Sequence, residues 1–278
     1  MENVKKNPKR VVLITGASSG MGLAAAKLFA RHDWIVYAGA RHVEQMHELE
    51  IRGINVMALD VTNKESNRIF VNTAKMEQHQ IDVLINNAGF GEFGSLEEVP
   101  TKKAENQFMV NLFGLSQLTH FVLPTMRCQH RGRIINISSI GADLYSPFGG
   151  WYYASKAALN QWSDVLDSES RRFGIRSIIV QPGPTKSNWS KVAFKNGFKN
   201  LPKNSPYQTL AKRFIDVFGQ LSQSSPATAE DLAQIFYRAA TDAKPKYRYY
   251  NRLTDHALVS FTRHFPRTYR KVIHQVFK

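Results

Sequence analysis

The sequence predicts an α/β fold: a single doubly wound domain with a mostly parallel sheet of about seven strands and helices on both faces. Short apolar runs alternate with helical segments through residues 9–250, which is the order that a parallel sheet with crossover helices requires. The first apolar run leads without a gap into a glycine-rich turn and an alanine-rich helix. A chain of 278 residues with 43% hydrophobic residues can bury the core of such a domain.

The first element is a predicted phosphate cradle. Residues 9–14 read as a buried strand and the helix begins near Leu23, so Thr15–Gly22 is the turn between them. Glycine permits the tight turn and the close approach of a ligand, and a helix N-terminus presents free N–H groups to an anion. The spacing is Gly-x-x-x-Gly-x-Gly, and a plain structural turn is the alternative. The candidate cofactor-binding residues here are Gly16, Ser18, Ser19, Gly20, Met21 and Gly22.

The second predicted strand, residues 34–40, ends at Arg41. In NAD-binding folds an acidic residue near this point accepts from the ribose 2′-hydroxyl, whereas an arginine accommodates a 2′-phosphate. The acid is missing and Arg41 is present, so NADP(H) is favoured and NAD(H) is the alternative. A competing interpretation is that Arg41 begins a surface helix whose acidic side chains, Glu44, Glu48 and Glu50, hold its guanidinium.

Two further strands carry polar residues at their ends. The third strand, residues 54–59, is followed by Asp60 and a helix over 63–79, so Asp60 could face an adenine or cap that helix. The fourth strand, 81–85, closes on Asn86-Asn87-Ala88-Gly89. The two asparagines suit either a turn or the bridging of neighbouring strand ends near a cofactor.

A long predicted helix, residues 101–126, contains Asn111 among apolar residues. A buried asparagine must find hydrogen-bond partners, and most such residues satisfy a backbone carbonyl rather than take part in catalysis. The fifth strand, 133–137, ends at Ser138-Ser139. Hydroxyls at the carboxyl end of a parallel strand lie at the crevice where ligands bind in such sheets.

The next helix opens with Tyr152 and Lys156 and runs to about residue 173. One helical turn separates the two residues, which places an ammonium beside a phenol. A phenol has a pKa of about 10, and the neighbouring cation is expected to lower it toward neutrality. With 10 Tyr in a lysine-rich chain, about one such spacing is expected by chance, so its meaning depends on the surrounding residues.

A sixth strand, residues 175–181, leads into the turn Pro182-Gly183-Pro184-Thr185-Lys186-Ser187. Residues 186–226 lack firm periodicity before 207–221 and are predicted to form a substrate-binding loop or lid. A helix over 227–240 and a last strand over 247–250 complete the domain.

The formal charge of +15 belongs mainly to the two ends of the chain. Residues 244–278 hold nine Lys or Arg and one acid, Asp255, and residues 1–10 add +3. The middle offers no basic stripe interleaved with aromatic residues, so a nucleic acid is not an expected partner. No apolar run is long enough to span a membrane, the polar tail 1–8 does not resemble a signal peptide, and Cys128 is the single cysteine. We therefore expect a soluble, cytoplasmic protein.

Residues 251–278 form a basic, amphipathic extension in which apolar side chains alternate with Arg and Lys. One interpretation is peripheral contact with a membrane surface. The favoured interpretation is a helix packed on the domain or in a subunit interface. Pro266 breaks the segment, which argues against one continuous amphipathic helix.

Together these residues resemble the short-chain dehydrogenase/reductase family of the Tyr-x-x-x-Lys type, over about residues 9–250, which implies a Rossmann fold. Residues 36–41 and the basic extension also look like the branch that contains hydroxysteroid and retinol dehydrogenases. The resemblance rests on the ordered occurrence of Thr15-Gly-x-x-x-Gly-x-Gly22, Asp60, Asn86-Asn-Ala-Gly89, Asn111, Ser139, Tyr152-x-x-x-Lys156 and Pro182-Gly183.

The resemblance implies a role for each catalytic candidate. Tyr152 would act as general acid in carbonyl reduction and as base in alcohol oxidation, and Lys156 would lower its pKa and bind the nicotinamide ribose. Ser139 would hydrogen-bond the substrate oxygen, with Ser138 as the alternative serine. Asn111 would hold a water that links the lysine to solvent.

The resemblance also extends the cofactor-binding set. Asp60 and Val61 match positions that contact adenine. The Pro182-Gly183 turn, with the backbone near Thr185 and the hydroxyl of Ser187, would fix the nicotinamide carboxamide. The family often has an aliphatic residue in place of Thr185 and Thr in place of Ser187, which leaves the hydroxyl assignment open. The remaining cofactor candidates are Asn87, Ala88, Gly89, Tyr152 and Lys156, and no metal ligand is expected.

We therefore expect an oxidoreductase that moves a hydride between NADP(H) and a ketone or secondary alcohol, mainly as a ketoreductase. The alternatives are an NAD-dependent alcohol dehydrogenase and a non-catalytic, cofactor-sensing protein. By the resemblance, a homodimer or homotetramer would form through the helices 101–126 and 152–173. Aromatic residues predicted to line the cleft favour an apolar substrate; the predicted lining is residues 90–93, Leu144, Tyr145, Phe148 and Trp151.

Overall fold

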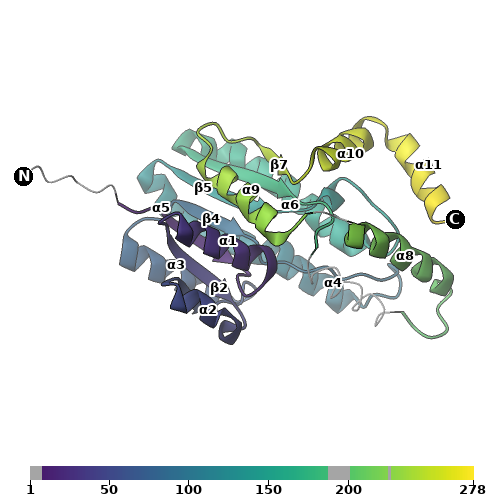
Figure 1. Cartoon of the computed structure of the whole chain (residues 1–278), viewed down its shortest axis with the longest axis horizontal. Coiled ribbons are helices and arrows are strands. Elements are labelled where there is room, and N and C mark those ends of the chain that lie inside the picture. The colour runs from purple at the N-terminus through teal and green to yellow at the C-terminus, as the bar shows by residue number, and fades with distance from the viewer. Residues whose placement is uncertain (1–7, 187–200, 225–226) are drawn as a thin grey trace, which may run out of the picture.

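Helices cover both faces of one central sheet, and the two C-terminal helices lie to one side of it (Figure 1). The structure is a computed structural model that describes residues 8–186, 201–224 and 227–278. Within these residues seven strands form a single sheet, and every pairing between neighbouring strands is parallel. The predicted doubly wound α/β fold is confirmed.

The strands lie close to their predicted positions. They are β1 (Val11–Thr15), β2 (Ile35–Ala40), β3 (Asn55–Ala58), β4 (Val83–Asn86), β5 (Gly132–Ile137), β6 (Ile175–Gln181) and β7 (Arg248–Tyr250). Their order in the sheet is β3-β2-β1-β4-β5-β6-β7, so the chain runs outward from β1 to β3 and then returns to the other side of β1. Ligands of such sheets bind outside the carboxyl ends of the strands at this reversal.

The helices form two layers. Those of the core are α1 (Gly20–Arg31), α2 (His47–Ile51), α3 (Lys64–Gln78), α4 (Thr101–Phe108), α5 (Leu115–Gln129), α6 (Gly150–Ser170) and α9 (Ala229–Thr241). Helices α1, α2 and α9 pack on one face of the sheet, and α3, α5 and α6 pack on the other. In β1, Val12 and Ile14 face the first layer whereas Val11 and Leu13 face the second. Because both faces are covered, the strand reads as an uninterrupted apolar run.

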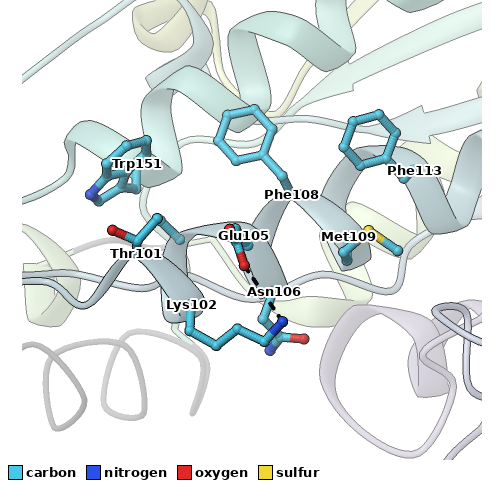
Figure 2. Close-up of a pocket in the computed structure, with 9 residues that line it drawn as sticks. Thr101, Lys102, Glu105, Asn106, Phe108, Met109, Phe113 and Trp151 are labelled. Atoms are coloured by element: carbon cyan, nitrogen blue, oxygen red, sulfur yellow. Dashed lines mark ion pairs between the residues drawn. The ribbon is translucent and has the colours of Figure 1, made fainter.

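The helix predicted over residues 101–126 changes its hydrogen-bond pattern in the middle. Helix α4 passes into a π-helical segment, Met109–Gly114, before α5 begins. Such π-helical turns occur frequently at functional sites, and Asn111 lies buried in this one. Phe113 of the same run faces outward and lines a groove with Trp151, which was expected in the substrate cleft instead (Figure 2).

The first residues of α3 contradict one of the two predictions for Asp60, namely that it caps this helix. The N-cap is Asn63, whose side chain accepts the N–H of Ser66 at 3.0 Å. Asp60 instead accepts from Thr62, from its N–H at 2.9 Å and its hydroxyl at 2.7 Å. The capping alternative for Asp60 is therefore wrong, because this carboxylate closes the tight turn between β3 and α3.

Among their described residues, the segment after β6 and the C-terminal extension contain the helices α8 (Gln208–Ser224), α10 (Leu253–His264) and α11 (Pro266–Val276). Residues 187–200 and 225–226 of the predicted substrate loop lie outside the described residues, as do residues 1–7 of the tail. Pro266 opens α11, so the extension is broken where the sequence predicted. Asp255, Val259 and Tyr269 are buried and pack it on the domain. In the described ranges, no helix combines the length and the apolar character that a membrane span needs.

Candidate active site

The glycine-rich turn follows β1 and is pressed against the turn after β4. Gly16 has φ +67°, and a Cβ on it would lie 2.9 Å from the Cα of Ala88. A Cβ on Gly22 would lie 2.4 Å from the carbonyl oxygen of Gly16. Both approaches are too close for any side chain, which is why the motif has glycine at these two positions.

Two asparagines bridge the neighbouring strand ends, as one of the two interpretations of the sequence predicted. Asn87 donates from Nδ2 to the carbonyl oxygens of Thr15, at 2.9 Å, and Gly16, at 3.1 Å. The Thr15 hydroxyl in return accepts the Asn87 N–H at 3.0 Å. One residue earlier, Asn86 donates to the side-chain oxygen of Asn136 on β5, at 2.9 Å. The edge of the sheet is therefore rigid where three strands end.

Helix α1 begins beside this edge with an unshielded N-terminus. Its N-cap, Ser19, makes no side-chain capping hydrogen bond, and its first turn contains no acidic residue. Ser18 and Met21 are half-buried, whereas Ser19 and Gly20 are exposed. The free N–H groups and the positive end of the helix dipole make this turn suited to an anion such as a pyrophosphate.

Arg41 lies exposed at the carboxyl end of β2, next to the strand that leads into the cradle. The interpretation in which acidic side chains of the following helix hold its guanidinium is contradicted, because those side chains pair elsewhere. Glu44 pairs with His42, Glu48 with Lys27 and Arg52, and Glu50 with His47. At the end of the next strand, Asp60 is exposed and Val61 is buried beneath it.

Ser139 lies where β5 ends and hydrogen-bonds the Tyr152 phenol. Its Oγ also accepts the N–H of Gly141 at 3.0 Å. Ser138, the alternative serine, is buried and donates to the carbonyl oxygen of Lys156 at 3.3 Å. The geometry therefore separates the two serines, since the contact with the phenol belongs to Ser139.

Burial dominates the pKa of Tyr152. Removal from water raises the pKa of the phenol to about 12, and the hydrogen bond from Ser139 offsets only part of this rise. The expected lowering by the Lys156 ammonium is wrong for this arrangement of the protein alone. The effect of burial is the larger one, and Lys156 Nζ donates to the carbonyl oxygen of Ile137, at 2.8 Å.

Lys156 and Asn111 both approach Gly89. A Cβ on Gly89 would lie 3.4 Å from Lys156 Nζ and 3.2 Å from Asn111 Oδ1. Asn111 accepts the Phe90 N–H at 3.1 Å and donates to the Phe90 carbonyl at 2.9 Å and to Ser155 Oγ at 3.0 Å. Burial lowers the pKa of Lys156 to about 8. A titratable amine and a fixed amide thus lie side by side, one helical turn from Tyr152.

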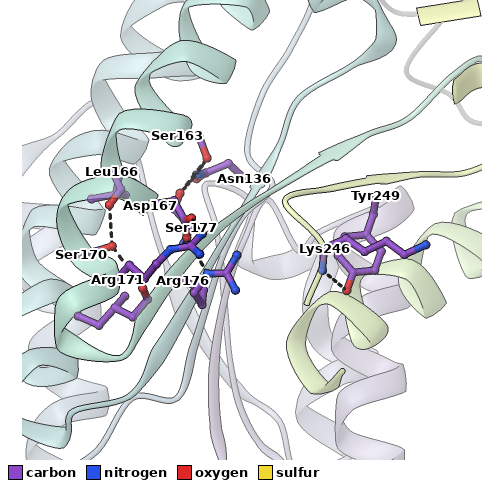
Figure 3. Close-up of polar contacts among 11 residues, drawn as sticks. Asn136, Ser163, Leu166, Asp167, Ser170, Arg171, Arg176, Ser177, Lys246 and Tyr249 are labelled. Carbon is purple, nitrogen blue, oxygen red and sulfur yellow. Dashed lines mark hydrogen bonds and ion pairs between the residues drawn. The ribbon is translucent and has the colours of Figure 1, made fainter. Parts of the chain in front are cut away.

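A buried polar network fixes the helix that carries Tyr152 against the sheet (Figure 3). Asn136 of β5 donates to Ser163 of α6 at 2.9 Å and to Ser177 of β6 at 3.2 Å. Asp167 of α6 accepts from Arg176 Nε at 2.8 Å and from the Ser177 N–H at 3.0 Å. Because these contacts join α6 to two strands, they set the position of its first turn relative to Ser139.

The turn after β6 closes the same edge. The carbonyl oxygen of Pro182 accepts the N–H of Ile140 at 3.0 Å, which ties this turn to the Ser139 loop. Thr185 donates its hydroxyl to the carbonyl oxygen of Gly183 at 3.3 Å. Ser187, predicted to contact the nicotinamide carboxamide, lies outside the described residues.

Aromatic side chains surround Tyr152. Its ring centroid lies 5.6 Å from that of Phe93, and the Phe93 centroid lies 6.0 Å from that of Phe214 on α8. Phe148 and Phe277 contact Phe214 with centroids at 5.5 Å and 6.4 Å. Two of the residues predicted to line the cleft, Phe93 and Phe148, thus belong to the aromatic cluster that contains Tyr152. Phe277, directly after α11, also contacts this cluster and was not predicted to do so.

The structure adds residues to the site that were not singled out from the sequence. Asp143 and Gln181 hold the Ser139 loop, and a Cβ on Gly183 would lie 2.5 Å from the carboxylate of Asp255. Two signals existed: Gln181 is the polar end of an apolar strand, and Asp255 is the one acid of the basic extension. For Asp143 the sequence holds no such signal.

A buried phenol beside a lysine, at the sheet edge that also carries a glycine cradle, suits proton transfer next to a bound dinucleotide. Fold and site together define the class of protein: a nucleotide-dependent oxidoreductase. Comparison with known proteins gives the family, because the family model described as short chain dehydrogenase matches residues 10–196. The chain belongs to the short chain dehydrogenase family.

Individual relatives agree with this assignment. A probable short-chain type dehydrogenase/reductase of Helicobacter pylori, VdlC, is 34% identical over 240 residues, which cover 86% of this chain and 87% of that protein. A 3-ketodihydrosphingosine reductase of Bacteroides thetaiotaomicron is 41% identical over 174 residues, 63% of each chain. The crystal structure of a short-chain dehydrogenase from Streptomyces avermitilis superimposes with a TM-score of 0.80 at 28% identity, covering 96% of this chain and 97% of that one.

Proposed function

We propose that the protein is an NADP(H)-dependent oxidoreductase that transfers a hydride between the cofactor and a ketone or secondary alcohol, and that it works as a ketoreductase on an apolar substrate. The observation that carries the proposal is the contact of Ser139 with Tyr152 at the edge where the glycine cradle lies. A hydroxyl pair at this edge can hold and protonate one carbonyl oxygen.

The residues present fit a dinucleotide. The close packing at Gly16 and Gly22 fixes the tight turn, and the unshielded N-terminus of α1 beside it suits the pyrophosphate. Asp60 and Val61 would lie at the adenine, residues 87–89 along the middle of the cofactor, and residues 182–185 at the carboxamide. When bound, the nicotinamide supplies the hydride that the carbonyl carbon receives.

The chain's own residues supply the proton. Tyr152 donates its phenolic proton to the substrate oxygen during reduction and takes one up during alcohol oxidation. Ser139 holds the same oxygen in place by hydrogen bonding. Lys156 and Asn111, which both lie close to Gly89, would return a proton to the phenol from solvent.

The preference for NADP(H) rests on Arg41. Its guanidinium is exposed at the end of β2, and the acidic residues of the following helix pair with other side chains. A cation at this position attracts a 2′-phosphate, whereas NAD(H) offers only a hydroxyl there. We also propose a cytoplasmic location, where a reduced thiol such as exposed Cys128 is stable.

The substrate class follows from the aromatic cluster around Tyr152. Phe93, Phe148 and Phe214 present apolar rings and offer no charge to a polar substrate. The similar protein of Bacteroides thetaiotaomicron is named for the reduction of a keto group. We therefore propose a ketone with an aliphatic chain as the substrate.

An NADPH-oxidation assay over a series of aliphatic ketones tests this function. Because each buried methylene contributes about 0.8 kcal/mol, kcat/KM should rise about fourfold per added methylene until the cluster is filled. Tight NADPH binding without turnover of any ketone would instead favour the cofactor-sensing alternative. Turnover with NADH at equal kcat/KM would favour the NAD-dependent alternative.

We propose a homodimer or homotetramer formed through α4, α5 and α6. Met109, Phe113 and Val165 are exposed on this face, and a groove of about 430 Å³ lies between α4 and Trp151 (Figure 2). Exposed apolar patches of this kind are common at subunit interfaces. Phe113→Glu should yield monomers in analytical ultracentrifugation, whereas Phe265→Glu, on the C-terminal extension, should not. A native protein that sediments as a monomer refutes the proposal.

Peripheral contact with an anionic membrane is a second partner proposal, confined to the outer face of α10 and α11. Phe261 and Phe265 are exposed there, and Arg267 and Lys271 lie beside them. In vesicle flotation, Phe265→Ser should reduce recovery with anionic lipid, whereas Ile51→Ser, which removes an even more exposed apolar side chain elsewhere, should not. Equal recovery with neutral and anionic vesicles removes the proposal.

A further inference from the structure

Helix α10 reaches the loop that carries Ser139 through an ion pair. Arg263 donates to Asp143 Oδ1 from Nε at 2.8 Å, and its Nη2 lies 2.7 Å from the same oxygen. Asp143 comes directly after the 3-10 turn Ile140–Ala142, whose N-cap is Ser139. The ion pair joins residues 120 positions apart in the sequence, so it ties the C-terminal extension to the catalytic loop.

The sheet holds the same carboxylate from the other side. Gln181, the last residue of β6, donates from Nε2 to Asp143 Oδ2 at 2.6 Å and to the carbonyl oxygen of Ser139 at 3.0 Å. Gln181 is fully buried, and the side chain of Asp143 is 12% exposed. One amide group therefore clamps the first and the last residue of the Ser139–Asp143 turn.

A carboxylate buried to this extent needs a cation or several hydrogen-bond donors. In the described part of the chain, Arg263 is the one cationic side chain within ion-pair distance of Asp143. Without it, the carboxylate turns toward water. This movement weakens its contact with Gln181, and through Gln181 the hold on the Ser139 backbone.

Two more contacts attach the extension to this side of the site. The Tyr269 hydroxyl donates to the carbonyl oxygen of Tyr145 at 2.8 Å, and the two rings meet edge to face with centroids 5.1 Å apart. Asp255, paired with Arg252 at 2.7 Å, lies against Gly183 in the turn after β6. The extension thus contacts both loops that flank Tyr152.

We infer that Arg263 is a positioning residue for Ser139, acting through Asp143 and Gln181, and that α10 and α11 brace the active site. The inference rests on the proposed function, because it takes Ser139 as the group that holds the substrate oxygen. The contacts act in sequence. If the Asp143 carboxylate moves, the Gln181 amide loses a hydrogen-bond partner and holds the Ser139 backbone less firmly.

Steady-state kinetics of Arg263→Ala tests the inference on the full-length protein. We expect kcat for ketone reduction to fall about tenfold while KM for NADPH stays within twofold, since an error of even 1 Å in a substrate-holding group is costly. Arg263→Lys keeps the charge and should restore most of kcat. Arg267→Ala, which removes an exposed arginine four residues away, is the matched control and should retain native kcat.

Combination with Ser139→Ala separates positioning from general destabilisation. If Arg263 acts through Ser139, Arg263→Ala should have little further effect in the Ser139→Ala protein. Additive losses, or an equal loss in Arg267→Ala, overturn the inference. If Arg263→Ala folds poorly, the double variant Arg263→Ala/Asp143→Asn serves in its place, because it also removes the buried charge. The kcat of the double variant should exceed that of Arg263→Ala alone.

Amide hydrogen exchange distinguishes failure of this inference from failure of the proposed function. Without cofactor or substrate, the N–H of Gly141, which donates to Ser139 Oγ at 3.0 Å, should exchange faster in Arg263→Ala than in Arg267→Ala. If the Gly141 N–H exchanges at the same rate in both variants, the inference that Arg263 positions the Ser139 loop is overturned, whichever substrate the enzyme reduces. If exchange is faster in Arg263→Ala but the native protein reduces no ketone, the positioning role of Arg263 stands and only the proposed function is refuted.

Discussion

The ammonium of Lys156 donates a hydrogen bond to the carbonyl oxygen of Ile137, at 2.8 Å. Ile137 is the last residue of β5, so the strand that delivers Ser139 to the site also holds the lysine. Desolvation of both side chains then has opposite effects, since it raises the pKa of the Tyr152 phenol to about 12 and lowers the pKa of Lys156 to about 8. Burial thus shifts each group toward its neutral form, while Lys156 keeps its charge below about pH 8.

Replacement of Tyr152 by Phe should abolish turnover. The change removes the proton donor and keeps the ring that packs on Phe93, so we expect kcat/KM to fall by about 10³-fold or more. The dissociation constant for NADPH, measured by fluorescence titration, should stay within twofold. Tyr153→Phe is the matched control, because its hydroxyl bonds Ser146 at 2.6 Å and should leave activity near the native value. A fully active Tyr152→Phe protein excludes the assignment.

Ketone reduction should lose activity as the pH rises through about 8. The lowered pKa of Lys156 means that its charge is lost near this pH in the folded protein, rather than near about 10.4 as in a free side chain. The neutral amine no longer attracts a ribose or supplies a proton toward Tyr152. The pH profile of kcat/KM reports this limb. A profile flat to pH 10, or the same limb in Lys156→Met, contradicts the assignment to Lys156.

Arg41→Ala should weaken NADPH binding and spare NADH binding. Loss of a charge-assisted contact with a 2′-phosphate costs about 1.5–3 kcal/mol, which raises the dissociation constant about 10- to 100-fold. NADH lacks this phosphate, so its dissociation constant should stay within twofold. Titration of both cofactors against Arg41→Ala, with Arg68→Ala of α3 as the control, checks the prediction. An equal loss for the two cofactors would show that Arg41 acts on the fold instead.

The sequence was sufficient for the strands and the cradle because their signals are local. Residues 175–181 were predicted as a strand and form β6 with these bounds, since a strand covered on both faces is an apolar run with polar ends. The π-helical turn within the helix over residues 101–126 was not predicted, because its extra residue shifts the phase of the apolar pattern and keeps the helical spacing on either side.

Contacts between distant segments could not be predicted from the sequence. The ion pair of Arg263 with Asp143 joins helix α10 to the loop after β5, which only the fold brings together, and neither residue stands out in its own segment. The pKa of Tyr152 was mispredicted for a related reason. Spacing shows the lysine one turn away, but burial by Phe93 and Phe214 from other parts of the chain sets the larger effect.

Gly22→Ala should disrupt the cradle. Its Cβ would lie 2.4 Å from the carbonyl oxygen of Gly16, so the turn must shift, at a cost of about 1–3 kcal/mol in the free energy of unfolding. The affinity for NADPH should fall more than tenfold as the turn moves. Gly219→Ala is the control, since a Cβ there meets nothing within 4 Å and should stabilise α8 by up to about 1 kcal/mol. Equal behaviour of the two variants contradicts the close approach.

Asp167 should make the stability of the protein depend on pH. Burial raises the pKa of its carboxyl, but hydrogen bonds from Arg171, Arg176 and the Ser177 N–H outweigh burial, and the pKa is lowered overall. A carboxyl with a lowered folded pKa contributes stability that is fully present above its unfolded value of about 3.9 and is lost as the pH falls through the folded value.

Asp167→Asn should therefore lower the free energy of unfolding at pH 7 by about 3 kcal/mol, since it removes the charge that two arginines face. The deficit relative to the native protein should shrink as the pH falls below about 4, because the native carboxyl is then protonated as well. Urea unfolding at a series of pH values measures both. Asp33→Asn is the control, because Asp33 forms an exposed pair with Lys9, and its free energy of unfolding should not change measurably. If the deficit of Asp167→Asn is the same at every pH, packing rather than charge holds α6 to β6.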